Sequence, residues 1–287
     1  MTQLQSKSPS DLEFAPRRPS FEIEQALATD WHGGSAFKTA YFNALSMLFP
    51  IGEKFFIDSV RHFRDQIDDP RLLKEVNAFQ GQEAVHRLEH QQFNETLCRL
   101  RGYDLEKIEK RLVDRLTWVR NNLSAKRQLA GTTAYEHLTA IMADDMLSHD
   151  DVMRGADPAV AALWRWHGVE ETEHKSVAFD VYLAVGGNVR VRRVALFMNS
   201  WYFFKDVFGI LGYMLKFDGK HTHIREWLSG LNFLFGYPGV LRRLTFKYIS
   251  YFRKRFHPWD HDNRDLIVQW TKQQSLQEQQ KQSAGVV

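Results

Sequence analysis

The chain has 287 residues, a net charge of +3 and 44% hydrophobic residues, enough apolar material for a packed core, which excludes wholesale disorder. Its single cysteine, Cys98, excludes an intramolecular disulfide framework and a zinc site built from cysteines. No stretch reaches about 18 uncharged apolar residues, so we expect no membrane-spanning helix. Without a signal peptide, the simplest compartment is the reducing cytoplasm.

Charge is distributed unevenly along the chain, which indicates two regions with different surroundings. Residues 1–187 carry 22 Lys+Arg against 28 Asp+Glu, whereas residues 188–287 carry 16 against 7. We expect a tail and approach segment, a helical bundle, a hydrophobic and basic helical extension, and a disordered tail over residues 1–34, 35–187, 188–270 and 271–287. The first twenty residues and the Gln-rich tail from Gln273 are predicted to be disordered.

Apolar residues recur with helical spacing and no segment shows the period of a strand, so the predicted fold class is all-α. The predicted helices span residues 35–67, 71–100, 104–125, 129–149 and 157–186. Pro50 lies inside the first helix and should kink or restart it there. Pro70 suits the first turn of the second helix, and Asp157 is a good N-cap for the last.

Glutamate and histidine recur in a fixed order on four of these helices. The last one carries His167, Glu171 and His174 at i, i+4 and i+7, within about 60° of one face. Two imidazoles and a carboxylate held that close form a plausible half-site for a divalent transition metal. The candidates on the other three helices are Glu53, Glu83, His86 and Glu136.

One carboxylate from each of two helices, with one Glu-x-x-His from each of two others, is the ligand pattern of ferritin-like dimetal bundles. Four packed helices can aim these side chains at a common axis, where bridging carboxylates neutralise two cations and each histidine fills a further position. Two Glu-x-x-His doublets alone are weak evidence, since a random order of the same residues would give roughly 0.7 such doublets. The alternative is a set of buried Glu–His and Glu–Arg pairs in an ordinary bundle.

Further polar residues lie near the candidate ligands in the sequence. His90 and His137 are candidates for holding the ligands from outside, although a single histidine is more often structural. Residues that could orient ligand histidines in the same way are Asp144, Asp145 and Asp180. Glu170 and Glu173 point about 100° or more off the ligand face and are predicted to lie on the surface.

The inward face around Glu136 is made of small residues. They are Thr132, Thr133, Thr139, Ala140 and Ala143. Small residues beside a buried carboxylate either leave a cavity for a substrate or for dioxygen, or permit close packing of the helices.

Aromatic and basic residues alternate within residues 194–257 of the extension. Residues 194–204 are all uncharged, and residues 241–257 hold six Lys/Arg and no acid. One interpretation is helices that pack on the bundle or on a second subunit, which would form a homodimer. The other is an amphipathic surface that rests on anionic lipid, as in a membrane-associated protein. No recognition motif indicates nucleic-acid binding.

At these residues the sequence resembles known families. The core, from about Phe49 to Phe179, resembles the bacterial family usually labelled "predicted metal-dependent hydrolase", which shares the ferritin-like arrangement. The second half-site is similar to that of arylamine N-oxygenases of antibiotic biosynthesis, which carry a third histidine on one iron, four residues before the Glu-x-x-His. His167 stands at that spacing. The ligands implied by the resemblance are Glu53, Glu83, His86, Glu136, His167, Glu171 and His174. As an alternative, His167 could pack structurally between Trp164 and Trp166.

The ligand set therefore predicts an oxygen-activating, non-haem di-iron oxidoreductase that acts on a small, apolar or aromatic substrate. Manganese or zinc could replace the two iron ions, because mixed His/carboxylate sites suit all three. Electrons would come from a separate donor protein, since no flavin or nicotinamide motif is present. The alternative is a dimetal hydrolase of esters or phosphoesters, in which the metals ionise a bound water. An iron store or scaffold fits the long hydrophobic extension less well.

Overall fold

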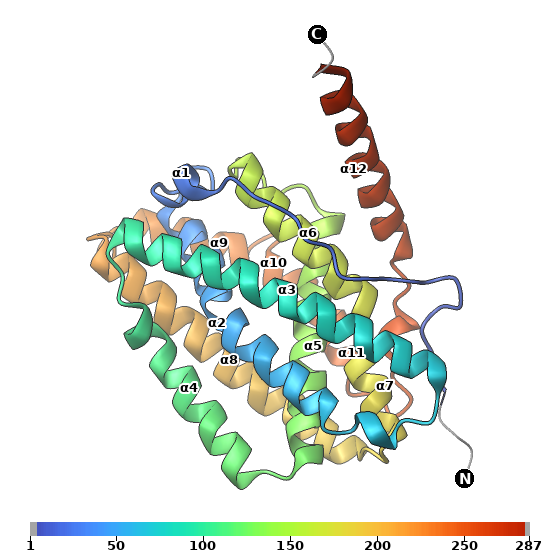
Figure 1. The fold of residues 1–287 in the computed structure, drawn as a ribbon. Helices are drawn as coiled ribbons and strands as arrows, with labels where there is room; N and C mark the ends of the chain where they lie inside the picture. The colour runs from blue at the N-terminus through green and yellow to red at the C-terminus, as the bar shows by residue number, and fades with distance from the viewer. Residues whose placement is uncertain (1–4, 285–287) are drawn as a thin grey trace.

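The computed structural model describes residues 5–284, and within that range the regular elements are all helices (Figure 1). The helices around the central core are α2 (Ala36–Arg61), α3 (Pro70–Arg101), α5 (Ala125–Ser148), α6 (Pro158–His174) and α7 (Val177–Ala184). The short elements α1 (Glu24–Leu27) and η1 (Arg64–Gln66) flank α2, and α4 (Leu105–Asn122) links α3 to α5. The predicted all-α class is confirmed.

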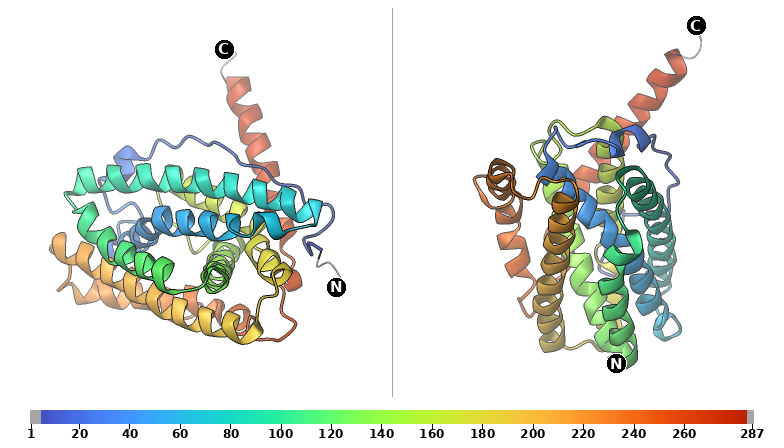
Figure 2. Two further views of the ribbon diagram at one scale, coloured as in Figure 1. Left: turned by 60° about the horizontal axis from the view of Figure 1, so that its bottom comes forward. Right: turned by 90° about the vertical axis from the view of Figure 1, so that its left-hand side faces the viewer.

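The extension begins with α8 (Val189–Phe217), which packs on α2 and α5 (Figure 2). Its residues Leu196, Val207 and Leu211 are fully buried in the same core as the bundle. The elements that follow are α9 (Ile224–Phe235), α10 (Val240–Arg243), α11 (Thr245–Ser250), η2 (Pro258–Asp260) and α12 (Arg264–Ala284). Packing on the bundle was one of the two interpretations of this region.

Sequence signals explain most helix ends. Asp69 caps α3 by accepting the Arg71 backbone N–H, and α3 ends at Gly102, whose φ of 76° favours glycine. Asp157 caps α6 because its side chain accepts hydrogen bonds from the backbone N–H groups of Ala159 and Val160. These caps fix where the helices carrying the Glu-x-x-His doublets begin.

Pro50 does not restart the helix, because α2 runs unbroken from Ala36 to Arg61. Proline removes the N–H that would bond the carbonyl of Ser46. The side-chain amide of Asn94, on α3, donates to that carbonyl instead at 3.0 Å. A neighbouring helix thus satisfies the group that proline leaves free, and α2 continues to Glu53.

The last predicted helix is two helices, because α6 ends at His174 and α7 begins at Val177. Contacts from both ends of the chain hold the intervening turn. The Lys175 amine donates to the His261 carbonyl, and the Ser176 hydroxyl contacts Ser8 and accepts from the Trp259 indole. Each partner is more than 80 residues away in the sequence: Ser8 precedes the turn, and His261 and Trp259 follow it. Helical periodicity therefore does not reveal the break.

The N-terminal segment is not a disordered tail over its described part. Residues 5–20 run along α3 and cross α6 (Figure 1). Ser6 bonds to Asp69 and Glu75, and a Cβ on Gly81 would come within 2.3 Å of Pro16. Gly81 therefore permits the close crossing of this segment, residues 5–20, which we call the N-terminal strap.

The C-terminal end is also helical where disorder is expected. Helix α12 continues from Arg264 to Ala284, past Gln273, and projects away from the rest of the molecule (Figures 1 and 2). The expected tail beyond Ala284 lies outside the described residues.

Buried His32 leads to a prediction for the pH dependence of stability. Its Nε2–H donates to the Val152 carbonyl at 2.9 Å, and burial lowers its pKa to about 4. Since the unfolded state binds this proton below pH 6.5 and the folded state does not, the free energy of unfolding should fall as pH drops from 6.5 to about 4. The full effect is roughly 3 kcal/mol. Urea unfolding at pH 7 and 5 should show a shallower pH slope for His32→Gln, and an unchanged slope for the exposed control His62→Gln.

Across residues 5–284, none of the helices combines the length and apolar character needed to cross a membrane. Exposed apolar side chains nevertheless line one face of α9, at Ile224, Leu228, Leu231 and Phe235. Contact of residues 194–257 with a lipid surface stays a prediction.

Candidate metal centre

The structure brings together the seven candidate ligands from four helices. Each is at most 4% exposed. The ligand atoms of Glu53, His86 and His167 lie within 4.8 Å of one another, and those of Glu83, Glu171 and His174 form a second such group. Glu136 adjoins the second group, with its Oε2 3.7 Å from the His174 Nε2. Two adjacent cation-sized sites result.

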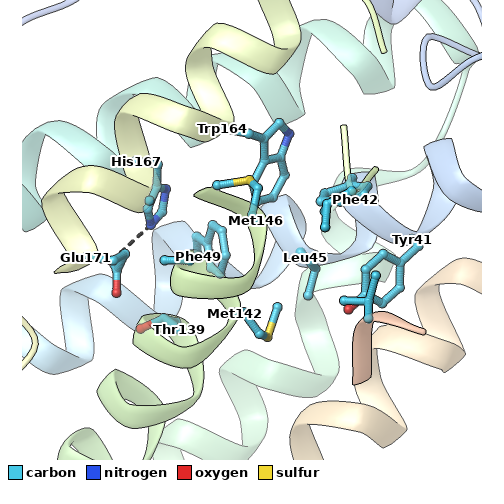
Figure 3. Close-up of a pocket in the computed structure, with 14 residues that line it drawn as sticks. Tyr41, Phe42, Leu45, Phe49, Thr139, Met142, Met146, Trp164, His167 and Glu171 are labelled. Atoms are coloured by element: carbon cyan, nitrogen blue, oxygen red, sulfur yellow. Dashed lines mark hydrogen bonds and ion pairs between the residues drawn. The ribbon is translucent and has the colours of Figure 1, made fainter. Parts of the chain in front are cut away.

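Glu171 lies between the two groups. Its Oε1 is 3.6 Å from the Nδ1 of His86 and 3.5 Å from the Nε2 of His174. It also accepts a hydrogen bond from the Nε2 of His167 at 3.0 Å (Figure 3). A carboxylate in this position can bridge two cations.

Unpartnered polar atoms are concentrated at this place. Sixteen buried side-chain N and O atoms of the described chain have no hydrogen-bond partner, and nine belong to the candidate ligands. They include both oxygens of Glu53, Glu83 and Glu136. A buried polar group without a partner costs about 1–3 kcal/mol, so an ordinary core does not collect nine of them. Coordination to cations would satisfy them.

Four carboxylates share this low-dielectric space. Burial and then the repulsion of Glu83 and Glu171 raise the pKa of Glu53 well above its ordinary value, and the same causes raise the pKa of Glu136. Glu171 behaves oppositely: burial would raise its pKa, but the hydrogen bond from His167 and the charge of the neighbouring His174 lower it well below the usual range. Two divalent cations would balance the four carboxylates and remove this repulsion.

Each candidate histidine has one ring nitrogen held from outside the centre. The Nε2–H of His86 donates to Glu170 at 3.1 Å, and the Nδ1–H of His174 donates to the Gln82 side-chain oxygen at 3.0 Å. The remaining nitrogens, His86 Nδ1 and His174 Nε2, have no partner. Outer hydrogen bonds of this kind fix the tautomer of a metal-binding histidine.

His167 is held by a longer relay. Its Nδ1 lies 2.6 Å from the Nε2 of His90, whose Nδ1 lies 2.8 Å from the hydroxyl of Ser46. That hydroxyl donates to Asn94 Oδ1 at 2.7 Å. If each group passes one hydrogen outward, the Nε2 of His167 carries no hydrogen and offers its lone pair to a cation, in place of the N–H that it directs at Glu171 in the other tautomer. His90 therefore lies where the sequence suggested, beside a candidate ligand.

The chain matches the family described as "predicted metal-dependent hydrolase" over residues 15–262. It belongs to that family. No curated protein and no solved structure matches the chain significantly. The family match extends past the core that the sequence resemblance covered, through most of the extension, and all seven candidate ligands lie within it.

Two glutamates of this family member are not surface residues as predicted. Glu170 and Glu173 are 0% and 2% exposed, because the N-terminal strap covers them. The Arg17 guanidinium donates to Glu170 at 3.1 Å and to both oxygens of Glu173 at 2.5 and 2.7 Å. Gln82 donates to Glu173 as well, at 2.7 Å. Helical spacing gave no sign of these roles, since the covering arginine lies over 150 residues away.

The three aspartates expected to orient ligand histidines pair with residues of the C-terminal extension instead. Asp180 accepts from His257, Asp145 from Arg243, and Asp144 pairs with Lys247. His137 bonds to the carbonyl of Lys247 and packs on Tyr251 instead of reaching a candidate ligand. These expectations were wrong because residues of the extension, whose positions in space the sequence pattern does not show, occupy these side chains.

An apolar cavity of about 50 Å³ adjoins the metal centre (Figure 3). His167 and Glu171 lie on one side of it, and Phe49, Met142 and Trp164 form much of the remaining wall. Of the small residues near Glu136, Thr139 and Ala143 line it, whereas Thr132 and Thr133 bond to Ser59 and Tyr251. Both expected roles of small residues, cavity formation and packing, are thus found.

Proposed function

We propose that this protein is an enzyme with a dinuclear metal centre of the ferritin-like kind. The observation that carries the proposal is the set of nine buried, unpartnered ligand atoms that face one another on four helices. The family description supports a metal-dependent enzyme independently of this geometry.

The residues fit two divalent cations. Glu53, His86 and His167 would hold one, Glu83, Glu136 and His174 the other, and Glu171 would reach both. Bound metals would supply Lewis acidity and, where redox-active, electrons for dioxygen. The choice of iron over manganese or zinc stays a prediction.

Hydrolysis is the reaction that the family description supports, in preference to oxygen chemistry. In this reaction the bound metals would make a water molecule more acidic, and an oxygen of Glu53 that does not hold a cation would accept its proton. The unpartnered oxygens of Glu136 could share this task.

Oxidation by dioxygen is supported by a different observation, the apolar cavity. Its lining includes no lysine or arginine that would bind the charge of a phosphoester. Hydrophobic walls beside the centre suit dioxygen, and a cavity of about 50 Å³ has room for a molecule of that size. The electron donor would be a separate protein.

Elemental analysis of anaerobically purified protein, followed by mixing with air, separates the two reactions. Iron and a transient visible absorption band after mixing would support oxidation. Zinc or manganese, no response to air and cleavage of a model ester would support hydrolysis. Absence of bound metal under both conditions would contradict the proposed function itself.

His167→Ala should retain two metals but change the reaction at the first site. The other six candidate ligands would remain to hold the cations; they are Glu53, Glu83, His86, Glu136, Glu171 and His174. We expect metal content near that of the parent and an altered rate or spectrum on mixing with air. The matched control is Trp164→Phe, which changes the neighbouring ring at a similar place in the cavity. An unchanged reaction would remove His167 from the ligand set.

A further inference from the structure

A groove of about 570 Å³ opens on the surface between α4, α5 and α8. Its lining is mostly apolar, and several of the lining side chains are exposed to water: Trp118 is 57% exposed, Val194 62% and Met198 42%. Exposed apolar side chains gathered in one concave place mark a binding site more often than a random surface.

The charge of the groove selects an anion. Arg127 and Arg190 line it and are exposed, and within residues 5–284 no carboxylate pairs with either. The groove lining contains no aspartate or glutamate. A third lining arginine, Arg115, is already neutralised by Asp206 and lies 5.0 Å from the ring of Tyr202. Two free guanidinium groups therefore remain at an apolar groove.

The groove leads towards the metal centre through side chains shared between cavities. Phe55, Leu116 and Tyr135 line both the groove and an inner apolar cavity of about 40 Å³. Phe49 and Thr139 line both this inner cavity and the cavity beside His167 and Glu171. The three spaces are therefore neighbours, separated by side chains that they share.

We propose that the groove is the substrate entrance and binds a free amphipathic anion, a carboxylate on an apolar chain. The carboxylate would pair with Arg127 and Arg190, and the chain would follow the apolar walls inward. A single molecule suits a concave groove with an inward route better than a lipid bilayer does, because a bilayer needs a convex or flat apolar face. This inference rests on the proposed function, since the route ends at the proposed metal centre.

Titration calorimetry with laurate, below its micelle-forming concentration, tests the groove on metal-loaded protein. Replacing both Arg127 and Arg190 by alanine should weaken laurate binding about tenfold or more, and leave binding of the uncharged dodecanol unchanged. The control Lys126→Ala with Arg225→Ala removes the same charge from exposed positions outside the groove lining and should change neither.

A second variant tests the apolar part of the groove. Gly131 lies in its lining, and a Cβ there would meet only the Asn199 side chain, at 3.5 Å. Gly131→Leu should therefore fold, keep its metals and lose both laurate and dodecanol. Equal laurate affinity in the double arginine variant and the parent would overturn the proposal. So would binding to anionic vesicles, lost in that variant, without binding of monomeric laurate. Laurate binding to a protein that takes up no metal would instead contradict the proposed function and leave the groove intact.

Discussion

Glu53→Gln is expected to remove most of the stabilisation that a divalent metal confers on the folded protein, while leaving the metal-free protein about as stable as the parent. In the metal-free state both Glu53 oxygens are buried without partners, and burial with the neighbouring carboxylates favours the protonated form. Glutamine has nearly the shape of that protonated carboxyl group, so little changes. It cannot supply a negative charge to a cation.

The measurement is the melting temperature with excess manganese(II) or iron(II) and with chelator. A 100-fold loss of affinity, with the metal at 100 times the parent Kd, would remove about 2.3–2.7 kcal/mol of metal-dependent stabilisation. Glu89→Gln is the matched control, because this half-buried glutamate lies on α3 outside the ligand groups. Equal metal-dependent stabilisation in Glu53→Gln and the parent would contradict a role for Glu53 as a ligand.

Helical periodicity predicted which candidate ligands share a helix face, and the resemblance to ferritin-like dimetal proteins supplied the full set of seven. Residues three, four or seven apart on a helix share a face, so His167, Glu171 and His174 had to point together once α6 formed. The lone glutamates needed only the packing of α2 and α5 beside α3 and α6. Which of these side chains bind a metal stays a prediction, because coordination depends on the metals as well as on the positions of the side chains.

Contacts between distant segments account for what the sequence did not reveal. Glu170 and Glu173 face away from the ligands on α6, and only the strap turns that outer face into a buried one. The uninterrupted course of α2 past Pro50 depends on Asn94 from another helix. Periodicity describes one helix at a time, and these features each join two or more.

Arg17→Ala is expected to weaken binding of both metals, by about 10- to 100-fold. Arg17 braces one histidine of each ligand group through separate relays. In the first, its guanidinium holds Glu170, which accepts the His86 Nε2–H. In the second, it holds Glu173, which accepts from Gln82, and the Gln82 oxygen accepts the His174 Nδ1–H.

Loss of the arginine should act in two ways at once. Glu170 and Glu173 would be buried without their cation, which costs free energy and leaves both carboxylates free to move away from His86 and Gln82. His86 and His174 would then be free to change tautomer or rotate away from the centre. A metal titration measured by calorimetry should show lower metal affinity at both sites in Arg17→Ala. The control Arg18→Ala, at the adjacent and exposed arginine, should bind metal like the parent. Arg17→Lys should fall between them, because an ammonium group keeps the charge but cannot hold both oxygens of Glu173 as a guanidinium does. Parent-like metal affinity in Arg17→Ala would mean that the histidines are positioned without the strap, by the packing of α3 against α6 alone.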